Sequence, residues 1–250
     1  MKRTLIIVLT VILCACEVID EADRLIPVPL PPANSRNHVL FDCTGFRCVN
    51  CPNAAEMAQS LVHMYPGQLF VVSLHPASNP FTQGVYDYTC PEADSIYIAL
   101  QGTPSTPFPA GNLDFKPYGD DLLAPYAEWP TMVYSAMGDT VAPYLDIAAF
   151  ADTTKHVVDI KAVYDKQQAR LMTMLVEDSV LGVQAMPDGS VNTAYYHRHM
   201  LRAASLRGEP LRLPQQCRLT HCSVVAVLID KNNTIIQADE TVISLSGADR

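Results

Sequence analysis

The chain has 250 residues, of which 49% are hydrophobic and 17% are charged, and its formal net charge is −9. The hydrophobic fraction excludes a chain that is disordered throughout. The negative charge, without any basic cluster, argues against a nucleic-acid partner, because binding to phosphates needs a basic face.

The N-terminus has the layout of an export signal. Two basic residues precede an apolar run over residues 5–13, which is too short to span a bilayer stably. The run ends in the sequence LCAC, residues 13–16, which resembles the cleavage site of a lipoprotein signal. We therefore expect residues 1–15 to be a lipoprotein signal peptide and Cys16 to carry the lipid anchor. An ordinary cleaved signal is the alternative.

Residues 16–36 are expected to act as the anchor and its tether. Four acidic side chains lie between Glu17 and Asp23, and proline then alternates with aliphatic residues from Leu25 to Pro32. Proline at this density favours an extended chain over a helix. The chain would then contact a membrane through its N-terminal lipid.

The first structured part of the chain is predicted to be strand, helix and strand. Residues 38–43 form a short apolar run, residues 48–63 show helical spacing of apolar side chains, and residues 69–74 read as a buried strand. Cys48 and Cys51 stand at the turn before the helix. The pattern therefore predicts a dithiol at the N-terminus of a helix.

The next segment, residues 75–128, contains five prolines from position 104 onward and reads as an insertion with one short helix over residues 93–100. Beyond it we expect a strand over residues 130–135, a hairpin turn over residues 137–140 and a helix over residues 144–154.

From His156 onward the apolar residues alternate with period two. Further runs typical of strands lie at residues 171–176, 194–201, 223–229 and 234–237. The sequence therefore predicts an α/β domain over residues 37–154, followed by an all-β, sandwich-like domain over residues 155–250.

The dithiol has a clear chemical logic. The free N–H groups and the dipole at a helix N-terminus favour a thiolate, so Cys48 is the expected nucleophile and Cys51 the resolving cysteine. The positive charge of Arg47 should further lower the pKa of Cys48. Two alternatives stay open: a permanently closed, inert disulfide, and a zinc site completed by Cys217 and Cys222.

Six cysteines remain after the signal and the anchor are set aside, and six allow 15 pairings. We expect two structural disulfides, one between Cys43 and Cys90 and one closing a small loop between Cys217 and Cys222. His197 and His199 would share one face of a strand, as a metal pair or as packed side chains. No metal is predicted, because the spacing of Cys217 and Cys222 is loose for a zinc pair and the tyrosines at positions 195 and 196 favour a packed strand. No cofactor is predicted, because the sequence has no phosphate loop or nucleotide fingerprint.

Residues 39–141 resemble the thioredoxin superfamily at three places. These are the strand, dithiol and helix; Asp42, six residues before Cys48; and the Trp-Pro-Thr sequence at residues 129–131, which looks like the cis-proline loop. The resemblance implies that Asp42 takes up the proton of Cys51 and that Pro130 positions the substrate backbone. Pro104 is the rival for the second role.

A second resemblance covers nearly the whole chain and rests on residues 41–52, 72–75, 129–131, 175–178 with Gln184, and 196–199. In these segments the chain resembles the outer-membrane-protein-28-related lipoproteins. The resemblance implies a thioredoxin-like part joined to a β-rich part at the outer membrane, on its periplasmic or surface face.

Two functions are consistent with these patterns. The first is a thiol-disulfide oxidoreductase that acts on disulfides of envelope proteins, with Cys48, Cys51, Asp42 and Pro130 as its site. The second is a surface binding lipoprotein in which the thioredoxin-like domain is a non-catalytic scaffold, because a fold by itself does not define an activity.

Overall fold

The N-terminal part of the fold is built around the strand β1 (His38–Cys43). In the computed structural model, β1 pairs in parallel with β2 (Leu69–Leu74) and antiparallel with β3 (Ala110–Leu113), and β4 (Ala124–Pro125) pairs with β3. The helix α2 (Cys51–Met64) connects β1 to β2. All residues of β1 and β2 are buried, as expected of strands covered on both faces. The predicted strand, helix and strand are therefore confirmed.

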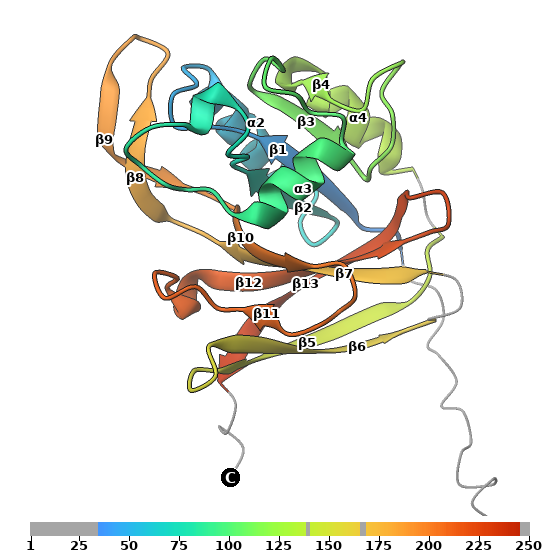
Figure 1. The fold of residues 1–250 in the computed structure, drawn as a ribbon. Helices are drawn as coiled ribbons and strands as arrows, with labels where there is room; N and C mark the ends of the chain where they lie inside the picture. The colour runs from blue at the N-terminus through green and yellow to red at the C-terminus, as the bar shows by residue number, and fades with distance from the viewer. Residues whose placement is uncertain (1–34, 139–140, 166–168, 246–250) are drawn as a thin grey trace, which may run out of the picture. The chain divides into compact units, whose positions relative to one another are not determined.

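The structure describes residues 35–138, 141–165 and 169–245, and the figures draw these in colour (Figure 1). The predicted signal peptide, the Cys16 anchor, nearly all of the tether and part of the turn at residues 137–140 lie outside the described residues.

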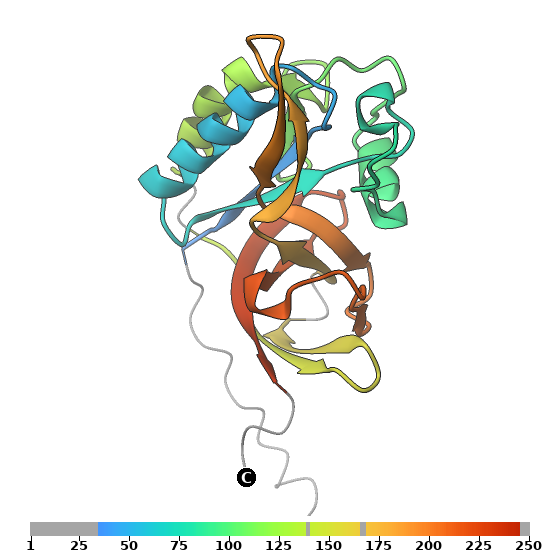
Figure 2. The same cartoon turned by 90° about the vertical axis from the view of Figure 1, so that its left-hand side faces the viewer.

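Helices cover both faces of this part of the sheet. Figure 2 shows α2 and α4 (Trp129–Ala136) on one side and α3 (Pro91–Ala99) on the other. Two 3-10 turns, η1 (Pro80–Thr82) and η2 (Tyr126–Glu128), lie in the connections. No helix among the described residues combines the length and apolar character needed to cross a lipid bilayer.

Two predicted elements after residue 128 were wrong. The segment expected to be a strand at residues 130–135 is the helix α4, because Trp129, Met132 and Val133 are buried at helical spacing and Pro130 occupies the first turn. The segment expected to be a helix at residues 144–154 is the strand β5, in which every second residue from Leu145 is buried. The side chains of Ala148, Ala149 and Ala151 are small, so this alternation is weak in the sequence.

The C-terminal part is rich in strands, as predicted. A two-stranded hairpin is made of β8 (Val180–Ala185) and β9 (Val191–His197), and a short 3-10 turn, η3 (Leu219–His221), precedes β12. The other strands are β5 (Leu145–Asp152), β6 (Val157–Tyr164), β7 (Arg170–Glu177), β10 (Met200–Ser205), β11 (Leu211–Arg212), β12 (Cys222–Ile229) and β13 (Ile235–Leu245).

These strands do not form a separate pair of facing sheets. Apart from the β8–β9 hairpin they join the N-terminal strands in one sheet, in the order β11-β6-β5-β13-β12-β7-β10-β2-β1-β3-β4. The link is a parallel bridge between Met200 of β10 and Ser73 of β2. The far strands β5, β6 and β11 turn back beneath β7 and β12 and enclose a second core (Figure 1). The sandwich-like architecture is therefore replaced by one sheet that curls.

The boundary expected near Thr154 falls in the turn between β5 and β6, and the described residues on both sides of it belong to one compact unit. Phe41 and Val72 of the N-terminal strands share a core with Met174 and Val225 of the C-terminal strands. The two parts therefore have common packing.

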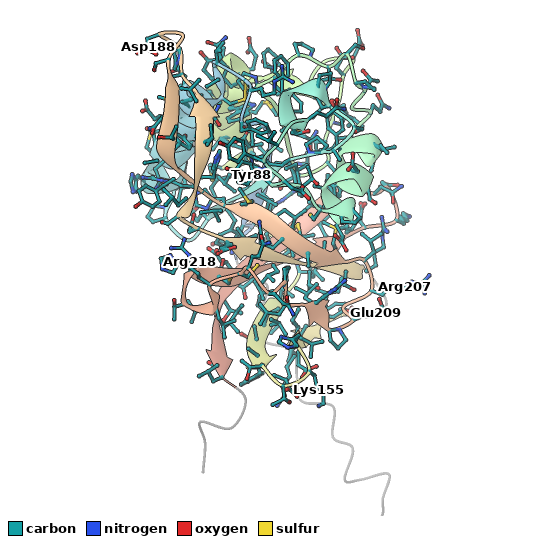
Figure 3. The ribbon with its side chains drawn as sticks, turned by 60° about the vertical axis from the view of Figure 1, so that its left-hand side comes forward. Tyr88, Lys155, Asp188, Arg207, Glu209 and Arg218 are labelled. Carbon is teal, nitrogen blue, oxygen red and sulfur yellow. A yellow bond between two sulfur atoms is a disulfide. The ribbon has the colours of Figure 1, made fainter. Side chains whose placement is uncertain are left out.

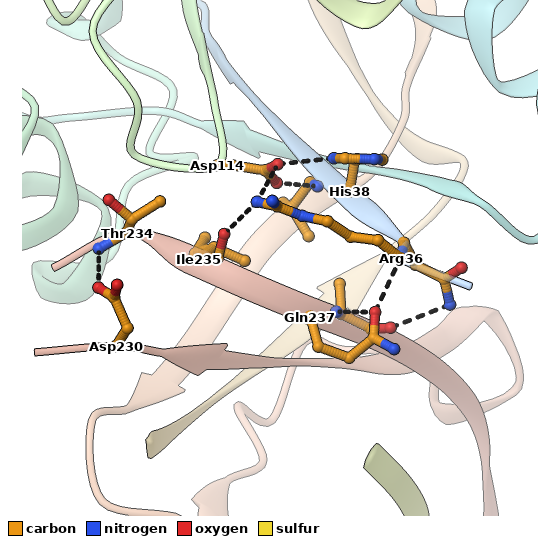
Figure 4. A network of polar contacts seen from close by, with 10 residues as sticks. Arg36, His38, Asp114, Asp230, Thr234, Ile235 and Gln237 are labelled. Atoms are coloured by element: carbon orange, nitrogen blue, oxygen red, sulfur yellow. Dashed lines mark hydrogen bonds and ion pairs between the residues drawn. The ribbon is translucent and has the colours of Figure 1, made fainter. Parts of the chain in front are cut away.

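A buried polar network also joins the two parts (Figure 4). The Asp114 carboxylate, which is fully buried, accepts from His38 Nδ1 at 2.6 Å and from Arg36 at 3.1 Å. Arg36 also donates to the carbonyl of Ile235 in β13 at 2.5 Å. The start of β1 is thus bound to the last strand of the sheet.

Candidate functional site

The dithiol loop is held by backbone bonds before α2 begins. The Cys48 N–H donates to the Gly45 carbonyl at 3.0 Å, and the Arg47 N–H donates to the Phe81 carbonyl at 3.0 Å. A Cβ at Gly45 would lie 2.6 Å from the Phe81 oxygen, so only glycine fits at this position. The η1 segment therefore packs against the dithiol loop and binds it through the Phe81 carbonyl.

Cys48 and Cys51 are joined by a disulfide at the first turn of α2. In this oxidised conformation both sulfur-bearing residues are buried: Cys48 is 1% exposed and Cys51 is 2% exposed. The Arg47 guanidinium is exposed and donates to the Gln83 carbonyl at 3.3 Å.

The β8–β9 hairpin bonds to the backbone of the dithiol loop. The Gln184 side-chain amide, which is 2% exposed, donates to the Cys48 carbonyl at 2.8 Å and to the Gly45 carbonyl at 3.3 Å. The Ala185 N–H donates to the Phe46 carbonyl at 2.8 Å. Figure 3 shows the hairpin standing beside the N-terminal part, with Asp188 at its tip. The hairpin and the dithiol loop are thus bonded together.

Behind the disulfide lies a small cavity that contains the predicted acid. Asp42 lines it together with Cys51, Ser73 and His75, and its volume is about 20 Å³, which is enough for one water molecule. Burial raises the pKa of Asp42 to about 7, against a hydrogen bond from the Ser73 hydroxyl at 3.5 Å. The structure therefore brings Asp42 and Cys51 together, as predicted.

In the same region His197, the last residue of the hairpin, packs against rings of the N-terminal part. The rings of Tyr88 and His197 lie 4.9 Å apart, and those of His75 and His197 lie 5.7 Å apart. Burial, and then the neighbouring charges of His197 and Arg202, hold the pKa of His75 well below its usual value. His75 is therefore neutral at physiological pH.

Pro130 does not form the cis-proline loop. It lies in the first turn of α4, whereas the cis peptide bond precedes Pro109, directly before β3. Ala110, the next residue, pairs with Cys43 of β1, and the Phe108 ring stacks on that of Phe81 at 5.8 Å. Pro109, and not Pro130 or Pro104, therefore follows the cis peptide bond and precedes a strand that pairs with β1.

Comparisons with known proteins support this reading of the fold. No family model and no curated protein matches the sequence. Among solved structures, the chain is similar to HBP35 of Porphyromonas gingivalis, with a TM-score of 0.66 and 17% identity over 88% of this chain and 80% of that chain. It is also similar to the protein AGR_C_4864 from Agrobacterium tumefaciens, with a TM-score of 0.51 and 13% identity over 83% of this chain and 95% of that chain.

The chain contains a thioredoxin-like fold. This follows from the β1-α2-β2 unit with its dithiol, from the proline before β3 and from the first similarity. At these identities the similarity concerns the fold alone.

The two expected structural disulfides are absent among the described residues. Cys43 and Cys90 are free, buried thiols, and Cys90 donates to the Leu201 carbonyl at 3.5 Å. Cys43 lies within β1, on the face opposite Asp42, and burial raises its pKa well above the usual value. Cys217 and Cys222 are also free, although they lie close together.

His197 and His199 have different partners and do not form a common site. His197 ends β9 and lies 3.3 Å from the Val183 carbonyl, whereas the His199 N–H donates to Asp178 at 2.8 Å. Burial lowers the pKa of His197 to about 4. The packed-strand interpretation therefore holds for His197.

Gln184 was not predicted to be a functional residue. It appeared only as one position of a family resemblance, and no local pattern connects it with a dithiol loop 136 residues earlier. Pro109 could have been considered for the role expected of Pro130 from the sequence, because it stands directly before residues 110–113, which form the short strand β3.

Proposed function

We propose that this chain is a lipid-anchored protein of the bacterial outer membrane whose thioredoxin-like part exchanges disulfides with envelope proteins. The observation that carries the redox proposal is the shared cavity of Asp42 and Cys51. A buried carboxyl whose pKa is about 7 is costly for a mere scaffold, and it is suited to accept a proton near neutral pH. The signal sequence supports the anchor at Cys16.

In the reduced protein, the Cys48 thiolate would attack one sulfur of a partner disulfide. The partner bond breaks, a Cys48–partner disulfide forms, and the released partner thiolate takes a proton from solvent. Cys51 would then give its proton to Asp42 and attack Cys48. This step closes the disulfide seen here and releases the partner's second thiol, so that two electrons pass to the partner.

Access to Cys48 in this scheme requires the β8–β9 hairpin to move. Gln184 and Ala185 hold the backbone of the dithiol loop, and Cys48 is 1% exposed while they do so. Hairpins that make few buried contacts open locally at low cost compared with global unfolding. The hairpin would thus control when the dithiol reacts.

The proposal is tested by redox titration of the purified chain in glutathione buffers, followed by mass mapping of the Cys48–Cys51 pair. We expect the pair to open and close reversibly, and a Cys51→Ser variant to accumulate mixed disulfides on Cys48. Cys43→Ser is the matched control and should trap nothing, because Cys51 is still present in it to resolve the mixed disulfide on Cys48. A pair that opens only when the chain unfolds would refute the redox function.

The second candidate is a surface binding lipoprotein with an inert disulfide, and the burial of Cys48 favours it. Under this alternative the chain binds its partner equally well when Cys48 and Cys51 are both replaced by alanine. The sequence segments shared with the outer-membrane-protein-28-related lipoproteins support either function equally.

A further inference from the structure

A second pair of cysteines lies at the base of the β8–β9 hairpin, outside the site described above. Cys217 is in the connection after β11, and Cys222 is the first residue of β12. Their sulfur atoms and a carboxylate oxygen of Glu177 lie within 4.8 Å of one another, and both thiols are free. The two sulfurs are therefore close enough to react with a small change in the loop between them.

A guanidinium group contacts one sulfur of this pair. Arg202 Nε lies 3.2 Å from Cys217 Sγ and 3.3 Å from Glu177 Oε2. Glu177 is 2% exposed, and it also accepts from the Arg218 N–H at 2.9 Å. Since Arg218 already shares the charge of Glu177, Arg202 can stabilise a negative charge on Cys217.

The two cysteines have different surroundings. Cys217 is partly exposed, whereas Cys222 is 6% exposed and its sulfur lies 3.4 Å from the Arg218 carbonyl. A hydrogen bond from the Cys222 thiol, and then the Arg202 guanidinium, lower the pKa of Cys217. The same contact and burial raise the pKa of Cys222. One thiol is thus suited to attack and the other to keep its proton.

The loop that carries the pair is held in place. The Arg218 guanidinium donates to the Ser179 and Asp178 carbonyls, and the Asp178 N–H donates to the His221 carbonyl at 2.9 Å. Figure 3 shows Arg218 at the lower end of the hairpin. These bonds keep the two sulfur atoms close to each other before a partner binds.

We propose that Cys217 and Cys222 form a second thiol-disulfide exchange pair, in which Cys217 attacks, Cys222 resolves and Arg202 positions the attacking sulfur. The substrate class is a small disulfide that bears both carboxylates and an amino group. A cleft of about 340 Å³ beside the pair is lined by Arg202 and Arg218, which suit the carboxylates, and by Asp87 and Glu177, which suit the amino group.

The reaction balances without a further reagent. The Cys217 thiolate attacks one sulfur of the small disulfide, the bond of that disulfide breaks, and the leaving thiolate takes a proton from solvent. Cys222 then loses its proton to solvent and attacks Cys217. The Cys217–Cys222 disulfide closes, the second small thiol is released, and two electrons have passed from the protein to the substrate.

A metal ion is the competing occupant, because Glu177, Cys217 and Cys222 could each offer one ligand atom. The Arg202 guanidinium, however, contacts two of these three atoms. A divalent cation in the same place would be repelled by this charge, and the described residues near the pair supply no fourth ligand. The contacts therefore favour a dithiol.

The first test measures thiol reactivity in the wild-type chain, with the Cys48–Cys51 disulfide closed. Limiting iodoacetamide at pH 7, followed by mass mapping, should label Cys217 about tenfold faster than the buried Cys90. Arg202→Gln should slow the labelling of Cys217, and Arg202→Lys should restore most of the rate. Arg212→Gln, which removes a charge at the other end of the same surface, is the matched control and should change nothing.

The second test uses a Cys48→Ala/Cys51→Ala chain, so that its outcome does not depend on the function proposed for the first dithiol. Oxidised glutathione should close the Cys217–Cys222 disulfide and release two thiols per chain, and adding Cys222→Ser should leave glutathione bound to Cys217. If that variant does not fold, the same exchange is followed in the wild type by mapping. Equal labelling of Cys217 and Cys90, a disulfide that mild reductant cannot reopen, or one zinc ion retained through gel filtration would each overturn the proposal.

Discussion

At the scale of single residues, the burial of Asp42 determines the pKa of its carboxyl group. Its carboxyl is 2% exposed, and one of its oxygens has no hydrogen-bond partner among the described residues. Removing a carboxylate from water favours the protonated form, which is why its pKa rises to about 7. This is the property that a proton acceptor for Cys51 needs.

Asp42→Asn should change stability in a pH-dependent way. The folded pKa is about 7 and the reference value is 3.8, so the folded chain keeps a proton that the unfolded chain releases between these values. Wild-type stability therefore falls as the pH rises from 4 to 7, and asparagine avoids this loss. We expect the variant to match the wild type at pH 4 and to exceed it by up to about 4 kcal/mol at pH 8.

Urea unfolding at the two pH values measures this difference. The control is Asp188→Asn at the exposed tip of the hairpin, where no gain is expected at pH 8. A gain of equal size at pH 4 and pH 8 would show that the effect is one of packing and has no connection with ionisation.

Gln184→Leu should make the Cys48–Cys51 disulfide easier to reduce. The change removes the hydrogen bonds to the Cys48 and Gly45 carbonyls, at about 1 kcal/mol each. If the hairpin opens locally before reduction, the rate of reduction by dithiothreitol should rise about thirtyfold, the factor that corresponds to about 2 kcal/mol. Val191→Ala, an exposed position of β9, should leave the rate unchanged. An unchanged rate in Gln184→Leu would mean that reduction proceeds by another route.

At the scale of elements, the β8–β9 hairpin differs from the rest of the sheet. Most residues of β9 are exposed or half-buried, and the hairpin pairs with no other strand among the described residues. Its contacts to the N-terminal part include the packing of the His197 ring against Tyr88 and His75, and a hydrogen bond from the Val183 N–H to the Tyr88 hydroxyl at 2.9 Å. Figure 3 shows Tyr88 close to the hairpin strands.

Tyr88→Phe should loosen this hairpin selectively. The change removes the acceptor of the Val183 N–H but keeps the ring against His197. We expect faster hydrogen exchange in β8 and β9 and unchanged exchange in the buried strand β12, as measured by mass spectrometry of peptides. Equal acceleration in β12 would indicate global destabilisation.

Whether an element could be predicted depended on its length and on its apolar pattern. The strands at residues 38–43, 69–74 and 223–229 are short, mostly apolar runs, so their type follows from local sequence. α4 was mistaken for a strand, because its eight residues combine β-branched and aromatic side chains with only two turns of helical period. In such short segments the surrounding packing decides the structure.

At the scale of the whole molecule, the two predicted domains share a sheet and a core. The bridge from β2 to β10, the mixed apolar cluster and the network of Arg36, His38 and Asp114 all cross between them. Parts that share this much buried surface are expected to unfold together.

Asp114→Ala should test this cooperation. The change leaves His38 and Arg36 without their buried acceptor, and breaking a buried ion pair costs about 3–5 kcal/mol. Trp129, the single tryptophan, reports on the N-terminal part by fluorescence, and circular dichroism reports on the strands of both parts. The two signals should give the same unfolding midpoint in the wild type, and again in the variant. The midpoint of the variant should lie at a lower urea concentration. Separate midpoints would show two independent domains.

The sequence by itself determined the strand, helix and strand with Cys48, Cys51 and Asp42, because their spacing and period are local properties of the chain. Only the tertiary structure decided that Gln184 donates to the Cys48 carbonyl, that Pro109 and not Pro130 precedes β3, and that Arg202 contacts Cys217. Each of these depends on how distant segments pack: Gln184 and Cys48, for example, are 136 residues apart. Local periodicity predicts which face of an element is buried, but it does not say which other element will bury it.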